Sequence, residues 1–264
     1  MRLLKLYLEY AKVHMKEILE YRLDAVIGFI AIAFTNLASL IFFWVIFANI
    51  PSLNGWTLGQ VLFIFGTIST AFGISHAFVP GVSVWWVEDL VQNGGLDRML
   101  LKPISILQHL LIYGGIDTDG FGDLVVGIAV LTVASNMIGI SWTIFSLGLY
   151  AILLVSAALI LISMHIIMST LCFWVVKAHP VADIFFALTK FTEYPIDIFS
   201  PVTVFFISLI VPVAFIGYYP AQIFIGQGLW LNAAYLTPVV AIILFFIASR
   251  VWNFGLKNYT STGS

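Results

Sequence analysis

Charge is what this sequence has least of. Only 9% of its 264 residues are charged, whereas 61% are hydrophobic. Soluble domains carry about 25% charged residues, so this chain has too little polar surface to cover a globule in water. A bilayer is the alternative solvent, and there apolar runs of about 20 residues form spanning helices. The net charge of −2 gives no basic surface for nucleic acid.

Cysteine is almost absent as well. The single cysteine, Cys172, lies inside an apolar run. A disulfide within the chain is therefore excluded, and a lone cysteine of this kind usually packs as a small hydrophobe. Residues 1–22 mix basic and acidic side chains, and no small-residue cleavage site follows them. We therefore do not expect a signal peptide.

Motifs for catalysis are missing too. The sequence has no G-x-x-x-x-G-K-[ST] loop for ATP, no H-E-x-x-H for zinc and no G-x-S-x-G nucleophile elbow. The segment DTDGFGD (117–123) is similar to a calcium loop, but Ile128 stands where that loop needs its twelfth-place glutamate. We predict a non-enzymatic chain with no catalytic residue, no metal site and no cofactor of its own.

Long apolar runs dominate what is present. They predict an all-α polytopic membrane protein with one domain over residues 1–264 and six spans. Residues 1–22 place apolar side chains at helical spacing among Lys and Glu, which predicts an amphipathic helix at the membrane surface. The fourth run exceeds the ~30 Å hydrocarbon core, so it must tilt or project. The expected spans are about 24–49, 58–80, 120–139, 142–176, 198–217 and 232–253.

The cations indicate the orientation. If the N-terminus is inside, every Lys and Arg falls in an inner segment or at the inner edge of a span, whereas the outer segments 50–57, 140–141 and 218–231 carry no charge. The positive-inside rule then predicts that both termini are cytoplasmic. We expect residues 183–200 to form an interfacial elbow on the inner side. Residues 217–232 are too short to span, which predicts a re-entrant or surface-lying outer hairpin.

Ionisable residues at membrane depth would mark an ion-driven transporter. On the predicted map, all acids lie in inner segments or at span edges, and only His76 and His165 lie within spans. Either histidine is a candidate proton site, but hydrogen bonding to a neighbouring helix is the simpler interpretation. The sequence therefore shows no engine of its own.

The stretch VQNGGLDRMLLKPIS (91–105) is the most polar feature of the long segment 81–119. Residues 88–91 can form a short amphipathic helix, which Asn93-Gly94-Gly95 would end because glycine accepts a left-handed conformation. Leu96, Met99, Leu100 and Leu101 would then be exposed unless something covers them. The stretch could equally pack on its own inner surface or bind a soluble partner.

Several motifs resemble a known family. Gly95-Leu96-Asp97 followed by Leu100-Leu101-Lys102-Pro103 resembles a signature of permease subunits of bacterial ABC exporters of the type-2 permease family. The similarity runs in matching order from about residue 20 to 255. Its further segments are 117–123 with Gly127, 194–199, 212–215 and 218–221.

The resemblance implies a multi-pass subunit of the bacterial plasma membrane, working with a second permease, identical or related. Two separate ATPase subunits would bind ATP and Mg and receive residues 86–103 as a coupling helix, with the N-terminal helix as a further contact. An outer gate would include Tyr218, Tyr219, Pro220 and Ala221. The ATPase-docking residues would be Trp86, Glu88, Asp89, Leu90, Asn93, Gly94, Gly95, Leu96, Asp97 and Arg98.

Three functions remain open at this point. The chain could be the membrane subunit of an ATP-driven exporter, a secondary transporter or channel acting alone, or a non-transporting membrane scaffold that recruits an ATPase. The apolar walls favour an amphipathic or lipid-like cargo over a small ion. Neither the cargo itself nor the choice between homodimer and heterodimer follows from the residues.

Overall fold

The computed structural model describes residues 2–114 and 116–260. This part of the chain is helical and contains no β-strand, only an isolated bridge between Leu53 and Trp56. The α-helices are α1 (Arg2–Glu20), α2 (Arg22–Asn49), α3 (Leu58–Phe78), α4 (Val84–Gln92), α5 (Gly95–Leu100), α6 (Ile106–Tyr113), α7 (Thr118–Ile138), α8 (Ile144–Ser169), α9 (His179–Ala187), α10 (Pro201–Phe205), α11 (Tyr218–Ile225) and α12 (Thr237–Lys257).

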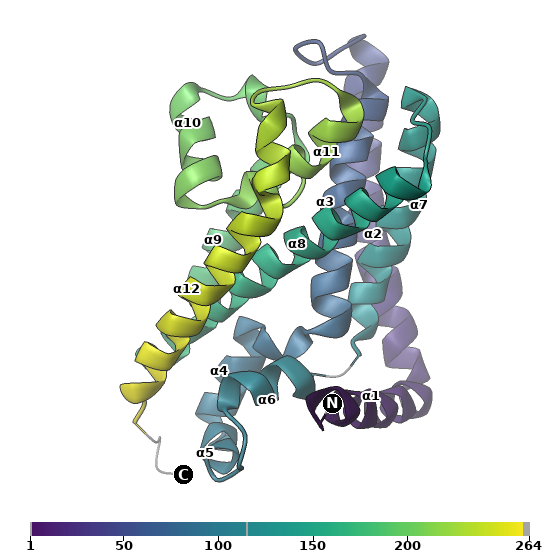
Figure 1. The fold of residues 1–264 in the computed structure, drawn as a ribbon. Helices are drawn as coiled ribbons and strands as arrows, with labels where there is room; N and C mark the ends of the chain where they lie inside the picture. Colours follow the sequence, from purple (N-terminus) through teal and green to yellow (C-terminus); the bar gives the residue numbers. More distant parts are fainter. Residues whose placement is uncertain (1, 115, 261–264) are drawn as a thin grey trace.

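Among the described residues, five helices are long and apolar enough to cross a membrane. They are α2, α3, α7, the run Ile144–Phe173 that contains α8, and the run Leu231–Lys257 that contains α12. In Figure 1, α2, α3 and α7 stand side by side, whereas α8 and α12 cross them obliquely. The tilt expected of the long fourth run is therefore present.

The predicted fifth span, 198–217, is not confirmed. Helix α10 has five residues and continues as one π-helical turn, Phe206–Ile210. Pro212 follows, and proline both lacks a backbone N–H and disfavours the helical conformation of the residue before it. The chain then makes the short 3-10 turn Val213–Phe215 and enters α11. The apolar run is thus divided by its proline into pieces that are too short to cross.

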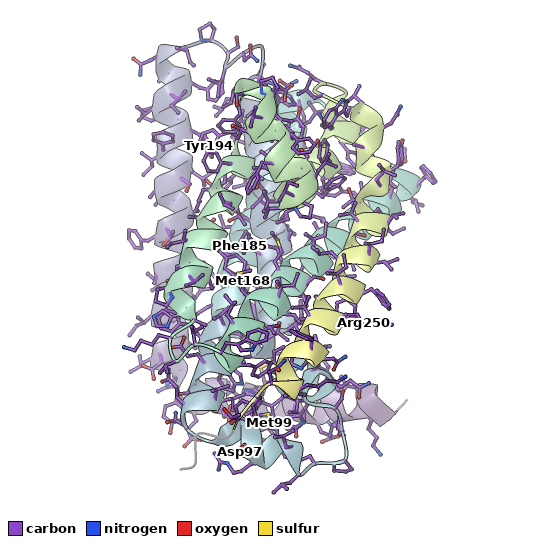
Figure 2. All side chains as sticks on the ribbon, turned by 90° about the vertical axis from the view of Figure 1, so that its left-hand side faces the viewer. Asp97, Met99, Met168, Phe185, Tyr194 and Arg250 are labelled. Carbon is purple, nitrogen blue, oxygen red and sulfur yellow. The ribbon has the colours of Figure 1, made fainter. Side chains whose placement is uncertain are left out.

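The prediction of an inner elbow over residues 183–200 is wrong. After α9 the chain forms the 3-10 segment Leu188–Glu193 and moves away from the α4–α5 end, as the positions of Phe185, Tyr194 and Asp97 in Figure 2 show. The Asn54 Nδ2 donates to the Asp197 carbonyl at 3.4 Å. Asn54 lies in the loop between α2 and α3, so Asp197 reaches the outer end of the predicted map. Apolar packing of Phe185, Phe186 and Tyr194 against the main core draws this segment inward.

Helix α3 forms the centre of the bundle and packs closely on α7. Glycines make this approach feasible. A Cβ atom at Gly73 would lie 2.4 Å from the Leu124 nitrogen, and one at Gly127 would lie 2.6 Å from the Thr70 nitrogen. Small residues at helix contacts let backbones approach in membrane proteins. The glycines therefore fix the distance between α3 and α7.

Helices α1, α4, α5 and α6 gather at one end of the bundle, which we call the α1 end (Figure 1). Helix α1 lies across the long helices, as expected for the amphipathic segment, and packs on α6. Its His14 Nε2 is 3.0 Å from the Tyr113 carbonyl, and the Tyr10 and Tyr113 rings meet edge to face at 5.2 Å. Residues 50–57, α10 and α11 form the opposite end, the α11 end.

Candidate functional site

The predicted docking stretch forms two short helices at the α1 end. Helix α4 begins after Ser83, whose Oγ accepts from the Trp86 nitrogen at 3.4 Å. Gly94 has a φ of +64°, and α5 begins at Gly95. Glycine adopts this left-handed conformation without a Cβ clash. The break predicted at Asn93-Gly94-Gly95 is therefore confirmed, with Gly94 as the left-handed residue, while the helix before it is longer than residues 88–91.

The predicted docking residues divide by exposure. Leu96 is fully buried and packs with Val87 and Met99 in an apolar cluster, whereas Leu101 is 87% exposed. The chain itself therefore buries Leu96 and Met99, whereas Leu100 and Leu101 remain exposed. The exposed docking residues are Trp86, Asp89, Asn93 and Arg98, the partly exposed ones are Leu90, Gly94 and Asp97, and the buried ones are Glu88, Gly95 and Leu96.

Glu88 faces inward and joins α4 to the start of α9. Its Oε2 accepts from the backbone nitrogens of Ala178 and His179 at 2.6 and 2.9 Å. Its Oε1 lies 2.9 Å from His179 Nδ1. The Gln92 Nε2 donates to the Val176 carbonyl at 2.7 Å, and the Trp85 ring stacks on His179 at 4.0 Å. We call this set of contacts the α4–α9 junction.

The carboxylate form of Glu88 is favoured at this junction. Burial by itself would raise its pKa, but the backbone and side-chain hydrogen bonds from His179, the backbone hydrogen bond from Ala178 and the charge of His179 together lower the pKa below its ordinary value. A negative charge also suits the N-terminus of a helix, where backbone N–H groups lack internal partners. Sequence reasoning assigned Glu88 to a partner's surface because burial cannot be read from one acid in an amphipathic stretch.

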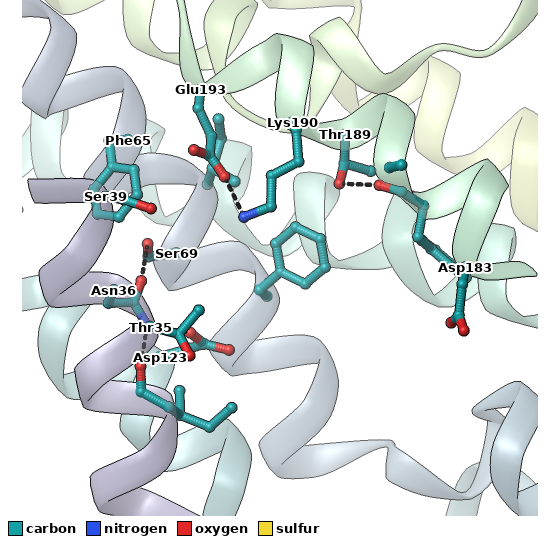
Figure 3. Close-up of a pocket in the computed structure, with 15 residues that line it drawn as sticks. Thr35, Asn36, Ser39, Phe65, Ser69, Asp123, Asp183, Thr189, Lys190 and Glu193 are labelled. Atoms are coloured by element: carbon teal, nitrogen blue, oxygen red, sulfur yellow. Dashed lines mark hydrogen bonds and ion pairs between the residues drawn. The ribbon is translucent and has the colours of Figure 1, made fainter. Parts of the chain in front are cut away.

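A polar cavity of about 440 Å³ lies between α2, α3, α7 and the segment that follows α8. Figure 3 shows Asn36 between Ser69 and Asp123 on one side, with Lys190 and Glu193 opposite. The Asn36 Nδ2 donates to Asp123 Oδ1 at 2.7 Å, and the Ser69 Oγ donates to Asn36 Oδ1 at 3.2 Å. Three neighbouring helices thus contribute to one hydrogen-bonded wall.

The cavity brings charge to membrane depth. Lys190 and Glu193 form an ion pair at 2.6 Å, and both line the cavity together with Phe65 and Ser69 of α3. At 1.5 Å of rise per residue, Phe65 and Ser69 lie about 10 Å or more from either end of α3. The prediction that only histidines occupy the spanning region is therefore wrong. Lys190 and Glu193 were missed because their segment was assigned to the inner surface.

A second cavity of about 430 Å³ adjoins the first, and Ile32, Asp183 and Phe186 line both. His76 and His165 line the second one, with their Nε2 atoms 3.2 Å apart. We expected each histidine to form a hydrogen bond to a neighbouring helix. In the structure, His76 of α3 and His165 of α8 are each other's partner.

The predicted gate residues Tyr218, Tyr219, Pro220 and Ala221 are all buried at the α11 end. The Tyr218 hydroxyl donates to the Asp197 carboxylate and accepts from the Leu229 nitrogen at 3.0 Å. The hydroxyls of Tyr219 and Ser208 are 2.9 Å apart. These bonds tie α11 to the segment that follows α9 and to the π-helical turn. The first half of the predicted hairpin is therefore covered by protein, whereas residues 229–232 are exposed.

Comparison with known proteins identifies the family. Residues 33–263 match the family described as ABC-2 family transporter protein, which covers most of the chain. No curated protein and no solved structure gives a significant match. Members of this family are membrane components of transporters that work with ABC ATPase partners. Because the family match covers most of the chain, and the structure has several apolar helices of membrane-spanning length, the chain belongs to the ABC-2 family of transporter proteins.

Proposed function

We propose that this chain is the transmembrane subunit of an ATP-driven exporter. Two ABC ATPase subunits would bind ATP and Mg and dock at the α1 end, and a second permease would complete the translocation path. Family membership and the absence of an ATP-binding motif from the sequence support this assignment. A permease without such a motif would depend on ATP hydrolysis in a separate chain.

The observation that carries the proposal is the α4–α9 junction. The outer side of α4 offers Trp86 and Asp89 to a partner, while its inner side holds α9 through Glu88. Helix α9 and the segment after it supply Asp183, Lys190 and Glu193 to the cavity. Force applied to α4 would reach the cavity wall through one short helix. This route would link ATP hydrolysis outside the membrane to a change inside it.

Exposed charges at membrane depth support a second permease. Lys190 and, nearer the α4–α9 junction, Asp183 are exposed on the side of the cavity, beside an α2 surface that is largely unburied. A charged side chain facing the centre of a bilayer costs about 2.5–3.5 kcal/mol on insertion scales. A second copy or a related chain against this side would remove that cost and enclose the cavity. Cargo would then pass between the two permeases and leave near α11.

The distribution of Lys and Arg supports an orientation with both termini in the cytoplasm, as proposed for a protein of the bacterial plasma membrane. The start of α1 and the end of α12 lie at the same end of the bundle as α4 and α5. Arg98, Lys102 and Lys257 are exposed there. Positive residues concentrate on the cytoplasmic side. Lys190 departs from this pattern, and its ion pair with Glu193 compensates for its depth.

Charge reversal at the exposed docking residues tests the proposal. Asp89→Lys with Arg98→Glu should abolish co-purification of the ATPase and its permease-dependent ATP turnover. Lys257→Glu is the matched control, because it reverses an exposed charge at the same end but outside α4 and α5. Unchanged assembly in the double variant would contradict the docking assignment.

The charges at depth also favour a second candidate, a secondary transporter acting alone, since ionisable residues inside a membrane commonly mark ion pathways. Reconstitution of the purified chain without any ATPase separates the two. Flux driven by a proton or sodium gradient would support the secondary transporter. Flux that needs the ATPase and ATP would support the exporter.

A further inference from the structure

The two adjoining cavities share a strong excess of negative charge. Five carboxylates line them, against one lysine and the His76–His165 pair. The lysine, Lys190, is already paired with Glu193. The carboxylates are Asp117, Asp119, Asp123, Asp183 and Glu193.

Four of these carboxylates lack a cationic partner from the chain. Within residues 2–114 and 116–260, Asp117, Asp119, Asp123 and Asp183 form no ion pair. Asp123 receives one neutral hydrogen bond, from Asn36. An unpaired carboxylate is costly where water is scarce, which applies most to Asp123 within α7, since Asp117 and Asp119 lie at the start of α7 and Asp183 is exposed. A bound cation would supply the missing charge.

A separate unsatisfied group points to the same place. His165 is only 9% exposed and lines the second cavity, and its buried Nδ1 has no hydrogen-bond partner among the described residues. Buried polar atoms of native proteins are normally paired. When His165 donates its Nε2–H to His76, this Nδ1 is a hydrogen-bond acceptor, and a ligand with an N–H group then has both this nitrogen and the carboxylates as partners.

Beside neutral polar groups such as Asn36 and Ser69, the walls carry aromatic side chains. Phe65 and Phe72 face the first cavity, Trp85 faces the second, and Phe186 lines both. Aromatic faces attract organic cations, and cavities of about 440 and 430 Å³ fall within the range of about 300–1,000 Å³ that suits small organic ligands. The combined space is much larger than a dehydrated metal ion needs.

We propose that the joined cavities bind a cationic amphiphile: an organic cation, such as an ammonium, with an apolar or aromatic body. Asp123 and Asp183 attract the cation, and the phenylalanines hold its apolar part. As a statement about cargo, this inference rests on the proposed function. As a statement about binding, it concerns this chain alone.

Two probes of matched shape and opposite charge test the inference. Tetraphenylphosphonium and tetraphenylborate carry the same four phenyl rings around a positive or a negative centre. The purified full chain in lipid nanodiscs, without any ATPase, should bind radiolabelled tetraphenylphosphonium saturably and tetraphenylborate at least tenfold more weakly. Asp123→Asn and Asp183→Asn should each weaken binding of the cation by tenfold or more.

The variants need a folding control and a surface control. Asp183 is exposed, so Asp183→Asn leaves the packing intact even where Asp123→Asn disturbs its bond to Asn36. Glu20→Gln removes an exposed carboxylate at the end of α1, away from both cavities, and should leave binding unchanged. Thermal unfolding of each variant establishes that it is folded.

Several results would overturn the inference. They are equal binding of the two probes, no saturable binding of the cation, displacement of the cation by millimolar sodium alone, and unchanged affinity in a folded Asp183→Asn variant. The ATPase co-purification assay is independent of this test. Cation binding without ATPase docking would refute the exporter and retain the binding site. ATPase docking without cation binding would refute the binding site and retain the exporter.

Discussion

At the scale of single residues, Glu88 differs most from its neighbours in the docking stretch. It accepts hydrogen bonds from two backbone nitrogens at the start of α9 and contacts the His179 ring, whereas Asp89 beside it is exposed. Charged hydrogen bonds contribute about 1.5–3 kcal/mol each. The Glu88 side chain therefore stabilises a contact between elements, whereas Asp89 is exposed to a partner and, among the described residues, bonds only within the stretch, accepting from Asn93 Nδ2 at 2.7 Å.

Replacing Glu88 by Gln should loosen α9 without changing the exposed surface of α4. Glutamine keeps the shape but loses the charge, so we expect a loss of about 1–3 kcal/mol in local stability. Hydrogen exchange at residues 176–187 measures this loss. Asp89→Asn is the matched control and should leave exchange at α9 unchanged. Full protection of α9 in Glu88→Gln would show that the junction does not depend on the charge.

The same contact predicts a pH dependence. The pKa of Glu88 is lowered from 4.5 in the folded protein, so its stabilising contribution is present above 4.5 and is lost as the pH falls through the lower folded value. Exchange at the Ala178 and His179 amides should therefore rise only in acid below pH 4.5. The Glu88→Gln variant should lack this pH dependence, and an unchanged dependence in that variant would assign it to another group.

At the scale of elements, the approach of α3 to α7 depends on glycines. Gly127→Ala would place a Cβ 2.6 Å from the Thr70 nitrogen, and overpacking of this kind costs about 1–3 kcal/mol. Gly148→Ala in α8 is the control, because nothing lies within 4 Å of its added Cβ, and alanine there should stabilise the helix by about 0.5–1 kcal/mol. Thermal unfolding in nanodiscs measures both changes. Equal changes in thermal stability for Gly127→Ala and Gly148→Ala would contradict the close packing of α3 on α7.

Elements were predictable where one physical signal dominates. Long apolar runs identified α2, α3, α7, α8 and α12, and the glycine pair in Asn93-Gly94-Gly95 identified the break between α4 and α5. The segment 183–200 failed because charged residues usually indicate the membrane surface, whereas Lys190 and Glu193 neutralise each other and enter the bundle as a pair. Pairing between residues is a tertiary property that hydropathy does not record. For the same reason the cavity of Figure 3 was missed.

At the scale of the whole molecule, the two ends and the centre have different tasks in the proposed exporter. The α1 end would receive the ATPase, the cavity would hold cargo, and the buried tyrosines of α11 would control release. A second permease would cover the exposed side of the cavity, where Asp183 and Lys190 lie beside α2. The sequence motifs named the class of transporter, but the cavity and its charge appeared only when segments far apart in the chain were brought together.

Photo-crosslinking from position 89 in intact cells tests the central claim, that α4 receives an ATPase. Asp89 is exposed, so a photoreactive residue there would touch any docked partner, and mass spectrometry would identify it. The account predicts a crosslink from position 89 to an ABC ATPase. With the crosslinker at position 93 instead, the Asp89→Lys and Arg98→Glu substitutions should abolish the crosslink. A crosslink to any other protein, or none to a nucleotide-binding subunit in an assembled complex, would contradict it.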